Sequence, residues 1–238
     1  MSMKLNRIFA AAALLFAVVA CENEPYRWEG DAYARLVGPE NWTLKTDSMI
    51  FSFSSMGSDV EDFAVKAEIK LIGVAADHDR DIILEVAPES TAEEGMYSFQ
   101  DTVILPAGEV VAPCDIILHR VEPLQDSTYR LKINITDKGT IGTGVKEWNQ
   151  LIIIFSDMLA KPSNWDEMLS PFFGEYSEVK HRFIIDVTGY AEFTYGETGG
   201  MSWGQMYNFQ LKLVKALEEY NATHTTPLTD ENNKLVTF

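Results

Sequence analysis

The strongest constraint on the fold of this chain is an alternation of apolar and polar residues that runs from residue 32 to about residue 157. It is clearest in residues 65–71 and 129–135, where every second side chain is apolar. Successive side chains of a β-strand point to opposite faces, so this period of two predicts strands with one buried and one solvated face. Shorter stretches of strand-like composition occur at residues 51–53, 82–86, 102–105, 116–118 and 151–155.

These stretches are separated by turn-forming residues rather than by amphipathic helices. The turn signals lie at residues 56–59, 76–79, 106–108 and 137–139. About seven short strands with turns between them predict a mainly β domain, an antiparallel immunoglobulin-like sandwich over residues 32–158. Residues 151–155 are apolar on both faces, which predicts a central strand or one that lies beneath the next domain. Sandwiches support binding, adhesion and enzymatic roles alike, so the fold does not define the activity.

The period changes in residues 159–238, which are expected to form a small helical C-terminal domain. Asn164 can cap a short helix. Ser177 can cap a second helix over residues 178–187, ended by Gly189. The second segment also fits the spacing of a strand, and we favour the helix.

The last helix has the clearest pattern of the three. Between Met206 and Tyr220 apolar residues recur at three- and four-residue steps, with lysine and glutamate on the other face. The preceding residues 196–204 are expected to form a glycine-rich loop that holds Trp203. Residues 235–238 are apolar enough either to add a small strand or to dock on the core.

The N-terminus has the three-part layout of a secretory signal. Lys4 and Arg7 precede an apolar run over residues 8–20, which is followed directly by Cys21. The run is too short to cross a bilayer, which takes about 20 residues. Its end resembles the bacterial lipoprotein box, in which the cysteine thiol receives a diacylglyceryl group. The alternative is an ordinary signal peptide with a cysteine there by chance.

Lipidation of Cys21 would divide the N-terminus into a signal peptide, residues 1–20, and a short polar tether, residues 21–31. Several acyl chains hold a protein to a membrane far better than one. Glu22 and Glu24 resemble the export tags of surface lipoproteins in the Bacteroidetes. We therefore expect an outer-membrane location that faces the cell surface.

The charge of the chain limits its partners. Lysine and arginine number 19 and the acidic residues 36, which gives a formal net charge of −17. Such a chain repels phosphate backbones, so nucleic-acid binding is disfavoured. It also repels anionic headgroups, so the lipid itself must anchor it. With Cys21 lipidated, Cys114 has no disulfide partner and is expected in the core.

The sequence contains no recognisable catalytic or cofactor motif. Its four histidines are far apart and none lies in a zinc-protease pattern. Residues 139–144 are glycine-rich, but Val145 follows where a phosphate loop needs lysine, so we interpret them as a flexible hairpin tip. We therefore expect no catalytic residue, no cofactor and no metal ligand.

For one acidic segment, calcium binding is left as an open alternative. Asp77, Asp79 and Asp81 alternate, as carboxylates that gather around calcium can. The helix-loop-helix calcium motif fails, because Ile82 replaces its glycine and Pro88 its final glutamate. A looser site at the edge of the sandwich or a solvated turn are the alternatives.

Tryptophans are the remaining candidates for ligand contact. They are Trp28, Trp42, Trp148, Trp165 and Trp203. Flat rings stack on the apolar faces of sugars and offer a large contact area. Trp203 is the first choice for an exposed platform and Trp42 the second, with packing against the sandwich as the alternative for each. Trp165 is expected in the core.

Several segments, in the same order along nearly the whole mature chain, resemble one known family. They are Asp47-Ser48-Met49-Ile50-Phe51-Ser52-Phe53, Asp79-Arg80-Asp81-Ile82, Thr91-Ala92-Glu93-Glu94-Gly95-Met96-Tyr97, Leu105-Pro106-Ala107-Gly108, Pro162-Ser163-Asn164-Trp165 and Phe173-Gly174-Glu175-Tyr176-Ser177-Glu178-Val179-Lys180. The chain resembles the Bacteroidetes lipoproteins described as domain of unknown function 4843. Its first domain is similar to the Calx-β type of immunoglobulin-like sandwich. The resemblance implies an envelope lipoprotein, often encoded near nutrient-uptake systems, and brings no catalytic residue.

Three functions remain, in order of preference. The first is a non-catalytic envelope lipoprotein, an accessory or glycan-binding component of an outer-membrane uptake system. The second is a structural or protein-interaction lipoprotein with no glycan ligand. The third, a hydrolase, ranks well below, because adjacent carboxylates such as Glu93 and Glu94 do not face one cleft in a strand.

Overall fold

The computed structural model describes residues 30–39, 48–144, 149–195 and 197–238. Residues Ala32–Phe238 form one compact unit, and the features below belong to it. Its strands are β1 (Tyr33–Val37), β2 (Ser48–Ser52), β3 (Asp62–Ile72), β4 (Arg80–Val86), β5 (Tyr97–Phe99), β6 (Thr102–Leu105), β7 (Val111–His119), β8 (Tyr129–Thr136), β9 (Gly142–Thr143) and β10 (Gln150–Ser156).

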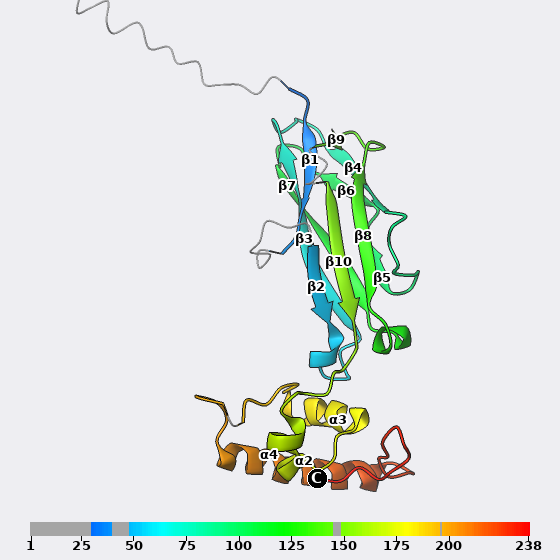
Figure 1. Ribbon diagram of the computed structural model, residues 1–238. Helices are drawn as coiled ribbons and strands as arrows, with labels where there is room; N and C mark the ends of the chain where they lie inside the picture. The colour runs from blue at the N-terminus through cyan, green and yellow to red at the C-terminus, as the bar shows by residue number, and fades with distance from the viewer. Residues whose placement is uncertain (1–29, 40–47, 145–148, 196) are drawn as a thin grey trace, which may run out of the picture. The chain divides into compact units, whose positions relative to one another are not determined.

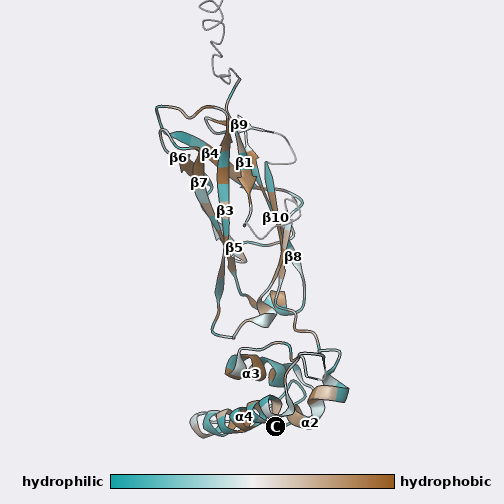
Figure 2. Ribbon diagram, turned by 90° about the vertical axis from the view of Figure 1, so that its left-hand side faces the viewer, coloured by the Kyte–Doolittle hydropathy of each residue, from teal (hydrophilic) through white to brown (hydrophobic). Residues whose placement is uncertain are grey.

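The strands form two five-stranded sheets. One has the order β5-β7-β3-β1-β9 and the other β2-β10-β8-β4-β6 (Figure 1). Figure 2, turned by 90°, shows β3 and β8 in separate layers. Buried and partly exposed residues alternate along β3, β7 and β8, as the sequence predicts. The inward side chains of both layers make one core.

Strand direction differs from the prediction of a purely antiparallel sandwich. Six of the eight pairings among the described strands are antiparallel, whereas β1 pairs with β9 and β2 with β10 in parallel. The sheets are therefore mixed. Alternation shows which face of a strand is buried but not which neighbour it pairs with, so the sequence pattern could not give the direction.

Two predicted segments are placed differently. The strand expected at residues 51–53 ends at Ser52, and Phe53 begins the 3₁₀ turn η1 (Phe53–Ser55) with its side chain fully buried. The flexible hairpin tip expected at residues 139–144 is wrong in part, because β9 lies within it and Ile141 is buried. The parallel bridge to β1 holds this segment against the sheet.

The strand expected at residues 151–155 is β10, which lies between β2 and β8 inside its sheet. Cys114, on β7, is a free and buried cysteine, as expected. Its burial, with a smaller effect of Asp115, raises the pKa of the thiol to about 11.

The helical part follows β10 and has its own core. It contains the π-helical turn η4 (Trp165–Leu169), α2 (Ser170–Phe173), α3 (Glu178–Thr188) and α4 (Trp203–Thr223). Ser177 caps α3 as predicted, since its side chain accepts a hydrogen bond from the Lys180 backbone, and α3 ends at left-handed Gly189. The choice of a helix over a strand for this segment is confirmed. Asn164 precedes η4 but makes no side-chain cap.

The C-terminal residues dock on this second core. Val236 is buried, and the ring of Phe238 stacks on that of Phe183 at 5.8 Å. One isolated bridge joins Thr229 and Leu235. Of the two alternatives for residues 235–238, docking describes the arrangement better than a strand.

A buried carboxylate joins the sandwich to the helical part. Asp157, just after β10, has no exposed surface. Its side chain accepts two hydrogen bonds from Arg120, which follows β7, and one from Arg182 of α3, all at 3.0 Å. Arg182 also donates to the Asp157 carbonyl at 2.8 Å. We call Asp157, Arg120 and Arg182 the junction cluster.

No helix among the described residues combines the length and apolar character that crossing a bilayer would require.

Candidate functional site

The start of α4 presents a pair of exposed aromatic rings. A capping box fixes this helix end: the Ser202 hydroxyl accepts from the Gln205 backbone at 3.3 Å, and the Gln205 side chain accepts from the Ser202 backbone at 2.8 Å. Trp203 is therefore the first residue of the helix rather than part of the loop that was predicted. Tyr207 lies one turn later on the same face. We call Trp203 and Tyr207 the aromatic platform.

The two rings of the aromatic platform stack on each other. Their centroids are 5.1 Å apart and their planes differ by 8°. Trp203 is 60% exposed and Tyr207 is 42% exposed. One turn further along, Leu211 is also exposed. The stack offers water a large, flat, apolar surface held on a regular helix.

Aromatic rings of the helical core pack against Trp203 of the platform. Phe172 of α2 is almost fully buried, and its ring lies 6.4 Å from that of Trp203 in a tilted contact. Tyr195 packs edge-on against Phe172 at 5.1 Å. Because α2 and α4 share one core, the position of Trp203 is set by the packing of the helical part.

The other predicted site residues have different positions. Trp165 is fully buried, as expected, and its Nε1 donates to the Gly174 carbonyl at 3.1 Å. Trp42 and the lipidation residue Cys21 lie outside the described residues. The sequence pattern did not single out Tyr207, although its four-residue spacing from Trp203 was a usable signal.

The acidic segment around Asp79 does not converge on one point. The Asp79 carboxylate accepts from the Ala107 backbone at 2.9 Å, and Asp77 pairs with His78. The hydrogen bond from His78 lowers the pKa of the Asp77 carboxyl below its usual value. In the part of the chain that the structure describes, no three acidic, histidine or cysteine side chains gather as metal ligands do.

A model of the family described as domain of unknown function DUF4843 matches residues 26–190. No curated protein matches the chain.

Several solved structures are distantly similar. One, described as a candidate carbohydrate-binding protein from Bacteroides ovatus ATCC 8483, has 13% identity and a TM-score of 0.39, with 55% of this chain and 38% of that chain covered. Bacteroides thetaiotamicron EndoBT-3987 with a Man5GlcNAc product has 14% identity and a TM-score of 0.39, with 51% and 30% covered. The apo form of the Calx CBD1 domain has 11% identity and a TM-score of 0.34, with 52% and 99% covered.

The chain thus spans well under half the length of the first two of these structures. Similarity at this level gives no information about activity.

Proposed function

The chain belongs to the family described as domain of unknown function DUF4843, and we propose that it is a non-catalytic lipoprotein of the bacterial envelope that binds glycans. Cys21 carries the lipid, and the protein faces the cell surface from the outer membrane. It serves as an accessory component of a nutrient-uptake system. The two mixed sheets are a variant of the immunoglobulin-like, Calx-β-like sandwich.

The exposed stacked rings of Trp203 and Tyr207 carry the proposal. The contact of an exposed tryptophan ring with water is unfavourable until a partner covers the ring, and its flat face matches the C–H face of a pyranose ring. The outer face of the stacked pair and the exposed ring edges offer a sugar ring a flat apolar contact. The strongly acidic chain favours neutral over anionic glycans.

A protein partner is the second candidate. Leu211, 51% exposed, extends the apolar surface of the aromatic platform by one helical turn. Sugars gain little from an aliphatic side chain, whereas an apolar protein surface would use all three residues. The contribution of Leu211 therefore separates the two functions.

Trp203→Ala is expected to weaken the retention of the chain by a neutral polysaccharide about tenfold or more, as loss of a central aromatic contact does. The free energy of unfolding should fall by less than about 1 kcal/mol, because most of the ring faces water. Affinity electrophoresis of residues 22–238 against a panel of polysaccharides, with urea unfolding of the same samples, measures both.

Two matched variants complete this test. Trp203→Phe should recover part of the binding, since it keeps a flat ring. Leu211→Ala should leave glycan binding unchanged. Retention by no polysaccharide would exclude the glycan function and favour a protein partner. Equal losses in Trp203→Ala and Leu211→Ala would mean that the aromatic platform does not carry the glycan binding.

Lipidation is tested on the full chain expressed in a bacterial host. We expect intact-mass spectrometry of the membrane fraction to give a protein that begins at Cys21 and carries diacylglyceryl and acyl groups. Cys21→Ser should move the protein to the soluble fraction, because no other segment of the mature chain is expected to hold the membrane. An unacylated product of the native sequence would refute the anchor.

A further inference from the structure

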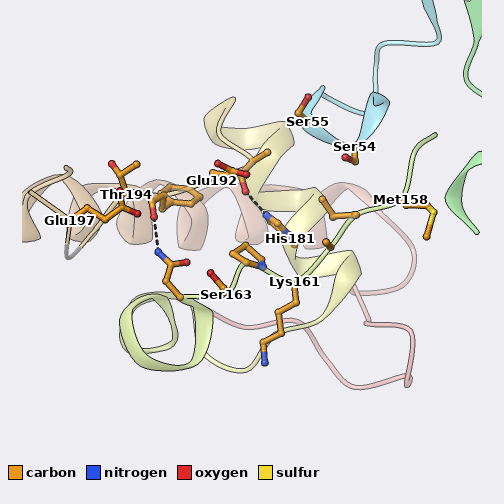
Figure 3. A pocket seen from close by; sticks show the side chains of 15 residues that line it. Ser54, Ser55, Met158, Lys161, Ser163, His181, Glu192, Thr194 and Glu197 are labelled. Atoms are coloured by element: carbon orange, nitrogen blue, oxygen red, sulfur yellow. Dashed lines mark hydrogen bonds between the residues drawn. The ribbon is translucent and has the colours of Figure 1, made fainter. Parts of the chain in front are cut away.

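A cavity of about 440 Å³ lies apart from the aromatic platform. Its wall is built from segments far apart in the sequence: η1, the connection at residues 158–164, residues 191–194 with Glu197, and His181 of α3 (Figure 3). Neither Trp203 nor Tyr207 lines it. Its volume falls within the range of about 300–1,000 Å³ that holds small ligands in proteins.

His181 is the most buried polar residue of this wall. It is 1% exposed, and its Nε2 lies 2.7 Å from the Ala191 carbonyl, which can only accept, so Nε2 is the donor. Its Nδ1 is buried and has no hydrogen-bond partner among the described residues. Burial, the largest effect, lowers the pKa of His181 and keeps the ring neutral, so Nδ1 is an unused acceptor. Buried polar groups without a partner are rare in folded proteins.

The wall contains half-buried uncharged residues and exposed charged ones. Ser54 and Asn164 are half-buried, whereas Glu192 and Glu197 are exposed. Neither of these two carboxylates has a partner among the described residues. Lys161, the basic residue of the wall, is held at 2.7 Å by both carboxylate oxygens of Asp166. The wall therefore offers no free cation to an anionic ligand.

We propose that this cavity is a second binding site, which takes one neutral, hydroxyl-bearing ring of monosaccharide size. The hydroxyls of such a ring can donate to and accept from the serine hydroxyls and the Asn164 amide of the wall, and the neutral imidazole of His181 adds no charge to it. An anion would meet Glu192 and Glu197 and find no counter-charge. This site does not depend on the aromatic platform or on its function.

The test uses residues 22–238 and the methyl glycosides of glucose, galactose, mannose and N-acetylglucosamine as separate probes. The readout is the ring ¹⁵N resonances of His181, because this ring lines the cavity and a bound ligand changes its surroundings. We expect a saturable shift with at least one glycoside. Ser163→Tyr and Ser55→Tyr, which fill the cavity from two exposed wall positions, should each weaken it about tenfold.

Ser127→Tyr is the matched control, because Ser127 is exposed and does not line the cavity. It should leave the His181 shift unchanged, and so should Trp203→Ala, which addresses only the aromatic platform. Failure of all four glycosides to move the His181 resonances would overturn the proposal. Tighter binding of glucuronate than of methyl glucoside would overturn it too, as would equal binding by both cavity-filling variants and the native chain.

Discussion

Asp157→Ala is expected to lower the free energy of unfolding by about 3–5 kcal/mol, which is typical of the loss of one partner from a buried ion cluster. The Asp157 side chain is fully buried and accepts three hydrogen bonds from Arg120 and Arg182. Removing it leaves two guanidinium groups in a largely buried position with no carboxylate between them. Urea unfolding followed by circular dichroism measures the change.

Asp166→Ala is the control for this prediction. Asp166 also pairs with a basic side chain, that of Lys161, but both partners are exposed. Exposed pairs contribute about 0–1 kcal/mol, so this variant should unfold almost as the native chain does. A loss of stability in Asp157→Ala no larger than that in Asp166→Ala would mean that the junction cluster does not hold the two parts together.

The double variant Asp157→Ala/Arg182→Met measures how much of the lost stability is due to the Arg182 charge that remains without Asp157. If the charge left uncompensated is the main cost, removal of Arg182 as well should recover part of the lost stability. Simple addition of the two single losses would contradict that explanation.

The sequence predicted the layers of the fold better than the connections between them. Alternation in β3 and β8 identified their buried faces correctly, because one face of each is covered by the other sheet. The parallel pairing of β2 with β10 could not be predicted from the sequence, since the relative direction of two strands depends on where the chain crosses between the sheets. The two-residue strand β9 was missed because it is too short to show an alternation of apolar and polar residues, and its pairing with β1 involves a distant segment.

The candidate sites were predictable to different degrees. Trp203 could be selected as a candidate contact residue from its type and its glycine-rich surroundings alone. The sequence placed it in a loop, whereas it lies on α4. Tyr207 could have been predicted from its four-residue spacing from Trp203. The cavity could not have been predicted, because Ser54 and His181 are brought together by the contact between the sandwich and the helical part. No local pattern encodes such a contact.

Trp165→Ala is the second large effect, with an expected loss of about 3–5 kcal/mol for a buried aromatic truncation. The Trp165 ring is fully buried and lies 5.0 Å from Tyr176 and 5.4 Å from His181. Removal of the indole therefore leaves a cavity in the helical core. Urea unfolding of the variant and of the native chain gives the difference.

Trp165→Phe should be intermediate, because it keeps a flat ring but loses the hydrogen bond to the carbonyl of exposed Gly174, which contributes about 0.5–1.5 kcal/mol. Trp203→Ala removes the same side chain from a position that is 60% exposed and serves as the matched comparison. If both alanine variants lost similar stability, the helical core would not depend on Trp165. A large loss of stability in Trp165→Ala and a small one in Trp203→Ala would mean that the buried ring stabilises the helical part. The exposed ring would then be available for binding.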